Sequence, residues 1–456
     1  KAIQVSGGED HSLAVASDGY VYAWGNNGSG RLGNNTRTDS SVPVRVRDPD
    51  SPTDASKGLK AIQVSGGEDH SLAVASDGYV YAWGNNGSGR LGNNTRTNSS
   101  VPVRVRDPDS PTDASKGLKA IQVNSGDDHS LALGSDGYAY AWGNNGSGRL
   151  GNNTRTDSSV PVRVRDPDSP TDASKGLKAI QVSGGEDHSL AVASDGYVYA
   201  WGNNGSGRLG NNTRTDSSVP VRVRDPDSPT DASKGLKAIQ VSGGEDHSLA
   251  VASDGYVYAW GNNGSGRLGN NTRTDSSVPV RVRDPDSPTD ASKGLKAIQV
   301  NSGYWHSLAV GSDGYAYAWG YNGSGQLGDN STDDSPAPVT VVFSLRPVIV
   351  GVRFDRDAAK GLTHGDGNSV TVTTPAHLPG TVTVSVDYTL GGAGSTLTYN
   401  NLQYTYMPVA PPGVLPRAGG EGILLALTTG MTGMGGVLAS RRHRREQLQL
   451  LHASHE

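Results

Sequence analysis

Short stretches of hydrophobic and polar residues that are typical of β-strands recur along this chain, separated by polar, glycine-rich segments. In the first part of the chain they are Ala2–Ser6, Ser12–Ala16, Tyr20–Trp24 and Val42–Arg47. The last stretch alternates valine with arginine, and Pro43 within it indicates an edge strand because proline donates no ladder hydrogen bond. The 3.6-residue period of an amphipathic helix is not seen here, so the pattern predicts an all-β fold.

The four strands belong to a block of 59 residues that recurs almost unchanged. The first copy is Lys1–Leu59, and further copies begin at Lys60, Lys119, Lys178, Lys237 and Lys296. A fixed period of this length is the signature of a solenoid or a propeller. Four short antiparallel strands per repeat are the content of one propeller blade, so we expect a β-propeller.

Three short motifs in each copy make the prediction more specific. They read Gly-x-x-His-Ser-Leu-Ala, Asp-Gly-Tyr-x-Tyr-Ala-Trp-Gly-x-Asn and Gly-x-Leu-Gly, and in the first copy they comprise Gly8, His11–Ala14, Asp18–Tyr20, Tyr22–Gly25, Asn27, Gly30, Leu32 and Gly33. This pattern resembles the repeat of the regulator of chromosome condensation (RCC1) family, and the resemblance covers residues 1–345. It implies a propeller, which in this family typically has seven blades.

The number of blades stays open at this point. Residues 1–17 and Asp313–Leu345 could each supply half of one blade and close a ring of six. Alternatively, a seventh blade is missing, and we favour this reading because seven is the family norm. The resemblance implies a blade boundary near Asp18, so Lys1 would lie partway through a blade, and we expect the chain to be a fragment whose natural N-terminus is absent.

Composition narrows the classes of function. The first copy carries six basic and seven acidic side chains, the whole chain has a net charge of −5, and no basic stripe argues for nucleic-acid binding. The chain has no cysteine, which excludes disulfides, thiolate metal sites and cysteine nucleophiles. We see no catalytic constellation, and we expect a protein that is not an enzyme and that holds no cofactor or metal.

Two residue types recur conspicuously in every copy. We expect each histidine to hydrogen-bond within its own blade, because equivalent positions in a propeller lie too far apart to share a metal. We expect each tryptophan to pack between blades. The residues are His11, His70, His129, His188, His247 and His306, with Trp24, Trp83, Trp142, Trp201, Trp260 and Trp319.

The sixth copy departs from the others in a way that suggests recognition. Tyr304 and Trp305 replace a Glu-Asp pair, and Tyr321 replaces an asparagine. Exposed aromatic side chains can form a platform for a partner. We therefore predict that these three residues bind an unknown protein or glycan ligand.

The region beyond the repeats has a different composition. Residues 346–408 contain Thr371–Gly380 and Tyr404–Tyr406, which resemble bacterial immunoglobulin-like IPT/TIG modules, although the module is short and we consider it incomplete. We therefore expect a small β-sandwich-like module, which the resemblance implies is a spacer or an adhesion unit. Residues 409–419 are a Pro-rich linker that ends in a short motif.

That motif, an apolar run and a basic tail follow in the order of a cell-wall sorting signal. The motif is Leu415, Pro416, Arg417, Ala418 and Gly419, which resembles the Leu-Pro-x-Thr-Gly sequence recognised by sortase. Residues 420–456 then hold the apolar run Ile423–Ala439, for which we expect a hydrophobic transmembrane helix, and a tail of arginines. Sortase and peptidoglycan are the implied partners, with the membrane contacted before anchoring.

We accordingly predict a Gram-positive surface protein, anchored to the wall or to the membrane, that displays a propeller for binding. Two alternatives come from other classes of protein. The chain could regulate a small GTPase as a guanine-nucleotide exchange factor, because eukaryotic members of the family that it resembles include such a factor. It could also inhibit a secreted enzyme.

Overall fold

The computed structural model describes residues 1–343, 347–365, 369–390, 393–406, 422–430, 433–440 and 451–452. The chain divides into two compact units, Lys1–Val342 and Phe343–Glu456. The repeats form the first unit, and each unit is described here by itself.

Each copy of the repeat folds into one four-stranded antiparallel blade. Blade one consists of β1 (Ala2–Gly7), β2 (His11–Ala16), β3 (Val21–Gly25) and β4 (Ser40–Arg45), paired in that order. The other blades repeat this order: β5 (Ala61–Gly66), β6 (His70–Ala75), β7 (Val80–Gly84) and β8 (Ser99–Arg104); β9 (Ala120–Ser125), β10 (His129–Gly134), β11 (Ala139–Gly143) and β12 (Ser158–Arg163); β13 (Ala179–Gly184), β14 (His188–Ala193), β15 (Val198–Gly202) and β16 (Ser217–Arg222); β17 (Ala238–Gly243), β18 (His247–Ala252), β19 (Val257–Gly261) and β20 (Ser276–Arg281); β21 (Ala297–Ser302), β22 (His306–Gly311), β23 (Ala316–Gly320) and β24 (Ser335–Thr340). The predicted propeller is confirmed, with six blades.

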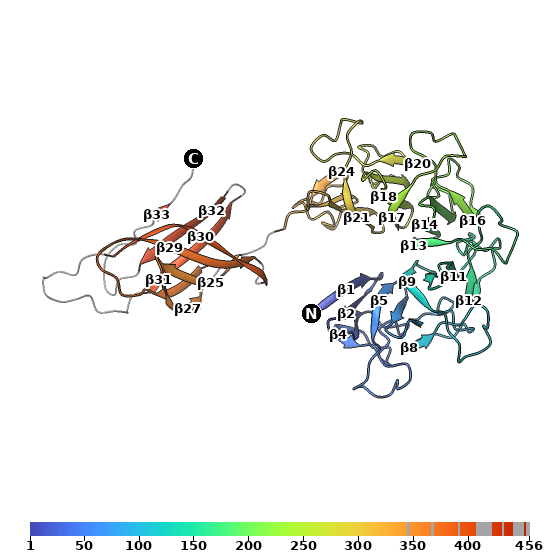
Figure 1. Cartoon of the computed structure of the whole chain (residues 1–456), viewed down its shortest axis with the longest axis horizontal. Coiled ribbons are helices and arrows are strands. Elements are labelled where there is room, and N and C mark those ends of the chain that lie inside the picture. The colour runs from blue at the N-terminus through green and yellow to red at the C-terminus, as the bar shows by residue number, and fades with distance from the viewer. Residues whose placement is uncertain are drawn as a thin grey trace. The chain divides into compact units, whose positions relative to one another are not determined.

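The blades are arranged around a central axis, with the first strand of each blade innermost (Figure 1). Every blade is built from a single copy of the repeat. No sheet in the described propeller combines strands of the first copy with strands of the last. The two half-blades that could have closed a six-bladed ring therefore do not form, because each terminal copy already completes its own sheet.

The hydrophobic core lies between neighbouring blades. In the core between blades one and two, Leu13 and Val15 pack against Val64 and Trp83, and all four are almost completely buried. Equivalent clusters fill the next four junctions. The prediction that the tryptophans pack between blades is confirmed, and each indole from Trp83 onward also donates a hydrogen bond to a carbonyl of the preceding blade.

The histidines also bridge blades, which corrects the prediction that they bond within their own blade. His11 Nε2 lies 2.8 Å from the Ser71 hydroxyl of the next blade, and this hydroxyl donates to the Arg31 carbonyl at 2.9 Å. The same pairing recurs at the four following junctions. Burial lowers the pKa of the histidines, which favours the neutral ring as part of the packed junction.

Substitution of two glycines that have positive φ would show how tightly the blades pack. Gly210 (φ 62°) leaves so little space that a Cβ would lie 2.9 Å from the Trp260 indole, whereas a Cβ on Gly196 (φ 84°) would meet nothing within 4 Å. We expect Gly196→Ala to cost about 1–2 kcal/mol of unfolding free energy, the penalty of the left-handed backbone alone. Gly210→Ala should cost about 2–5 kcal/mol because overpacking adds to that penalty. Urea denaturation of the two variants measures the difference, and equal losses would contradict this description of the junction.

The second unit contains two antiparallel sheets. One orders β26 (Asp357–Ala358), β25 (Pro347–Phe354), β29 (Gly380–Leu390) and β30 (Ala393–Tyr406); the other orders β27 (Lys360–His364), β28 (Ser369–Thr373), β31 (Gly422–Gly430), β32 (Gly433–Ser440) and β33 (Leu451–His452). Phe354, Val372 and Val384 are among the residues of its hydrophobic core. The likeness to IPT/TIG modules stays a prediction.

The prediction of a hydrophobic helix after residue 420 is wrong. Those of its residues that the structure describes form β31 and β32, two paired strands in which Gly430 lies opposite Gly433, and β31 adds to β28. Glycine and threonine, which recur in this segment, have low helix propensity. None of the described residues lies in a helix with the length and hydropathy to cross a bilayer. Residues 415–419 lie outside the described residues.

Candidate axial binding site

A cavity of about 420 Å³ lies at one end of the propeller axis and is lined by all six blades. Its walls are the ends of the inner strands and the loops that follow them. Five of these loops place a carboxylate at the cavity, and the sixth places a tyrosine. We call this set the axial mouth: Glu9, Glu68, Asp127, Glu186, Glu245 and Tyr304.

Glycines let neighbouring loops of the axial mouth approach each other closely. A Cβ on Gly67 would lie 2.5 Å from Cε1 of His70 and 2.6 Å from the carbonyl oxygen of Gly126 in the next blade. The loop therefore needs glycine here because it is wedged between its own histidine and its neighbour's backbone. The amide of Glu9 also donates to the Gly67 carbonyl at 3.3 Å, which links two adjacent loops.

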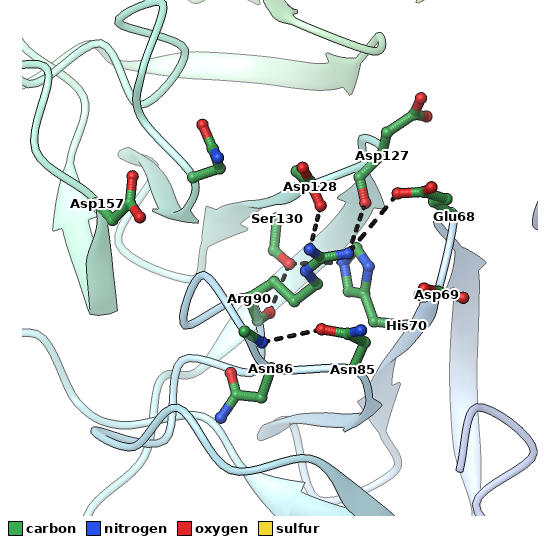
Figure 2. Close-up of polar contacts among 12 residues, drawn as sticks. Glu68, Asp69, His70, Asn85, Asn86, Arg90, Asp127, Asp128, Ser130 and Asp157 are labelled. Atoms are coloured by element: carbon green, nitrogen blue, oxygen red, sulfur yellow. Dashed lines mark hydrogen bonds and ion pairs between the residues drawn. The ribbon is translucent and has the colours of Figure 1, made fainter. Parts of the chain in front are cut away.

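A second carboxylate follows each one of the axial mouth, and from Asp69 onward this second carboxylate forms an ion pair with an arginine at a blade junction. Figure 2 shows Arg90 directed at Asp128, with which it forms an ion pair. The Arg90 side chain is only 7% exposed; it also donates to the Asp127 carbonyl at 3.4 Å and lies 3.9 Å from Glu68. Arg31, Arg149 and Arg208 make the corresponding ion pairs. These arginines therefore neutralise carboxylates at the junctions, and Arg267, which has Trp305 in place of the following aspartate, forms an ion pair with Glu245 of the axial mouth at 3.5 Å.

The axial mouth itself keeps an excess of negative charge. Burial, opposed in part by the Tyr304 hydrogen bond, raises the pKa of Asp127 to about 6, with further raising by neighbouring carboxylates that include Asp128 and Glu9. Burial and nearby carboxylates also raise the pKa of Glu68 and of Glu186. Half-buried carboxylates that repel one another are stabilised by a cation brought between them. The arrangement is therefore suited to a positively charged ligand.

The structure separates the three aromatic residues predicted to bind a partner. Tyr304 belongs to the axial mouth, and its hydroxyl donates to the Asp127 carboxylate at 2.9 Å, a contact between blades six and three. Trp305 instead meets Tyr321 edge to face, with ring centroids 5.4 Å apart. Trp305 and Tyr304 are 45% and 39% exposed. A role for these residues in binding stays a prediction.

Sequence reasoning missed the carboxylates of the axial mouth. Their signal was the Gly-Gly-Glu-Asp segment that precedes the His-Ser pair in most copies. A single acidic residue in a loop is usually a solvated surface charge. Only the ring brings five of them to one cavity.

The recurring His-Ser pairs do not form an accessible nucleophilic site. His188 and Ser248 are completely buried, and the serine hydroxyl already donates to the Arg208 carbonyl at 2.9 Å. Across the described part of the chain, no cluster of three or more His, Asp or Glu side chains could hold a metal ion.

Comparison with known proteins gives a consistent match over the propeller. A family model described as the RCC1-like domain matches residues 1–359. The ultraviolet-B receptor UVR8 of Arabidopsis thaliana is 33% identical over 337 residues, which cover 74% of this chain and 69% of the receptor. The human E3 ubiquitin-protein ligase HERC2 is 29% identical over 74% of this chain, but the match covers only 6% of that ligase.

Solved structures agree with this match. The crystal structure of human WBSCR16 superimposes with a TM-score of 0.62 at 26% identity and covers 76% of this chain and 83% of that one. The structure of Prp20p from Saccharomyces cerevisiae, described together with its binding properties to Gsp1p and histones, has a TM-score of 0.59 at 25% identity. It covers 75% of this chain and 77% of that one.

Proposed function

The chain belongs to the RCC1-like domain family, and we propose that its propeller is a protein-interaction platform whose axial mouth binds a basic segment of a partner protein. The observation that carries this proposal is the convergence of Glu9, Glu68, Asp127, Glu186 and Glu245 on one cavity. The proposed action is recognition and not catalysis.

The chemistry of the axial mouth supports a partner rich in lysine and arginine. Burial and neighbouring carboxylates raise the pKa of Asp127, Glu68 and Glu186, and a bound cation would stabilise their ionised forms. Tyr304 adds an aromatic ring at the same cavity, and aromatic rings attract lysine and arginine. Prp20p, a structural relative, is described as binding histones, which are basic proteins.

Titration with a basic peptide tests this proposal. A twelve-residue peptide of alternating lysine and glycine should bind, and a peptide with glutamate in place of lysine should not. Because exposed charges are screened by salt, we expect about tenfold weaker binding of the basic peptide when ionic strength rises from 50 to 300 mM. Isothermal titration calorimetry measures both effects. Equal affinity for the two peptides would contradict the proposal.

Binding should also depend on pH near the pKa of Asp127. Its carboxyl titrates at about pH 6 in the free propeller, and a bound cation favours the ionised form. We therefore expect full affinity above pH 7 and loss of affinity as the pH falls through 6. Asp127→Asn should bind more weakly at pH 7.5 and should lose most of the pH dependence between pH 7.5 and 5.5. A profile identical to that of the unchanged protein would show that Asp127 takes no part.

Display on a bacterial surface remains a separate prediction. It rests on the order of Leu415–Gly419, the apolar run and the arginines that follow it. The relatives named above come from a plant, from yeast and from humans. Fractionation of the producing cells, with Ala418→Trp as the matched variant that should block sortase, tests the prediction. Recovery of both proteins from the cytosol alone would overturn it.

A further inference from the structure

Blade six carries two aromatic side chains on the loops next to the axial mouth. Trp305 is 45% exposed and meets the half-buried Tyr321 edge to face, with ring centroids 5.4 Å apart. We call these two residues the aromatic pair. Trp305 follows directly on Tyr304, which lines the axial mouth. One loop therefore contributes both to the anionic cavity and to an apolar surface.

The packing of the blades does not require the aromatic pair. In blade five the same two positions hold Asp246 and Asn262, and blades one to four also have aspartate and asparagine there. The backbone link between the two loops is unchanged by the substitution. The Asn262 amide donates to the Asp246 carbonyl at 2.9 Å, and the Tyr321 amide donates to the Trp305 carbonyl at 2.9 Å. Loops of this shape therefore fold with polar side chains in five blades of the same protein.

The tryptophan also changes the charges at its junction. The position of Trp305 faces the preceding blade, since the equivalent Asp246 forms an ion pair with Arg208 of blade four. Arg267 of blade five has no aspartate to pair with there, and it forms its ion pair with Glu245 at 3.5 Å. One carboxylate of the axial mouth is thus neutralised beside the aromatic pair. This side of the mouth is less anionic and more apolar than the others.

A glycine leaves room for the tyrosine ring of the pair. A Cβ on Gly323 would lie 2.5 Å from Cζ of Tyr321, so the ring lies directly against the glycine backbone. In blade five, a Cβ on Gly264 would lie 3.5 Å from Oδ1 of Asn262, which is an ordinary contact. Contacts with Gly323 and with Trp305 hold the Tyr321 ring in place before any ligand arrives, which lowers the entropic cost of binding.

We propose that the aromatic pair binds an aromatic side chain that adjoins the lysines or arginines of the basic segment in the axial mouth. This inference rests on the proposed function and adds a second requirement to the partner. The first five copies present nearly the same acidic loop, so a basic segment alone has several equivalent placements around the axis. Only the sixth copy offers aromatic rings there, and an aromatic contact at this blade selects one placement. The shared loop and the loss of two acidic residues from it favour this occupant.

Peptides that differ by one phenylalanine test the proposal. The twelve-residue peptide of alternating lysine and glycine is compared with two versions that carry a phenylalanine at one end or at the other. The better of the two versions should bind the full chain about three- to tenfold more tightly than the peptide without phenylalanine. Isothermal titration calorimetry at one ionic strength measures the three affinities.

The double variant Trp305→Asp, Tyr321→Asn is the main control. It restores at both positions the residues that blade five carries, so its loops should fold as those of blade five do. It also returns to Arg267 the kind of partner that Arg208 has in Asp246. The double variant should bind the plain basic peptide at least as tightly as the unchanged chain does, and the gain from phenylalanine should disappear.

A matched pair of glycine variants tests the position of the tyrosine ring without removing it. Gly323→Ala should displace Tyr321 and lower the gain from phenylalanine at least threefold, while Gly264→Ala should leave the gain unchanged. If the plain peptide binds and phenylalanine brings no gain, or if the gain persists in the double variant, this inference is overturned and the proposed function stands. If none of the three peptides binds, the proposed function fails and the inference fails with it.

Discussion

Replacing Trp201 with alanine should lower the free energy of unfolding by about 3–5 kcal/mol, the range for truncating a buried aromatic residue. Trp201 is completely buried among residues of two blades, Leu131 and Val182 among them. Its indole also donates to the Arg149 carbonyl at 2.8 Å. The substitution leaves a cavity at the junction and removes the hydrogen bond. The packing of the indole and its hydrogen bond to the Arg149 carbonyl are therefore both lost.

Trp305→Ala is the control for this prediction. Trp305 is 45% exposed and contacts Tyr321, so its removal should cost no more than about 1 kcal/mol. Chemical denaturation followed by circular dichroism measures both variants under the same conditions. Similar losses for the two tryptophans would show that the inter-blade core is not the main source of stability.

Neutralising three carboxylates of the axial mouth should reduce affinity for a basic peptide by about a hundredfold or more, if each contributes about 1–2 kcal/mol to a charge-assisted contact. The variant combines Glu68→Gln, Asp127→Asn and Glu186→Gln, which keep the shape of each side chain. Burial, and after it the neighbouring carboxylates, raise the pKa of all three groups, so their ionised forms are disfavoured in the free protein. The variant should therefore fold at least as well as the unchanged chain.

A matched variant removes the same number of charges from the outer loops. Asp109→Asn, Asp168→Asn and Asp227→Asn lie at exposed loop positions of three blades. If net charge alone attracts the peptide, both triple variants should lose the same affinity. The proposed site requires that the outer-loop variant bind within about threefold of the unchanged protein.

The strands could be predicted from the sequence because alternation and turn residues are local signals. Val42–Arg47 was expected and β4 covers Ser40–Arg45, a shift of two residues. The partners of the histidines were not predictable in the same way. His11 contacts Ser71, which lies 60 residues further along the chain, and only the packing of whole blades brings the two side chains together.

The same limit applies to the axial mouth and to the C-terminal segment. Glu68 and Glu186 belong to separate loops, and the cavity exists only once the inner strands surround an axis. The apolar character of Ile423–Ala439 suggested a helix, but hydropathy contains no information about which strand a segment pairs with. Val370 pairs with Leu425 in the structure, and this long-range pairing decides between helix and strand.

Hydrogen–deuterium exchange with and without the basic peptide tests the central claim most directly. Copies three and six differ in sequence from the others at the axial mouth, so proteolytic peptides that span residues 124–129 and 301–306 can be assigned to their blades. If the axial mouth is the binding site, exchange should slow in these two segments when the peptide is bound, and it should stay unchanged in the outer loops, which have the same sequence in the first five copies and are followed together. Slower exchange in the outer loops with no change at 124–129 and 301–306 would contradict the axial mouth as the binding site.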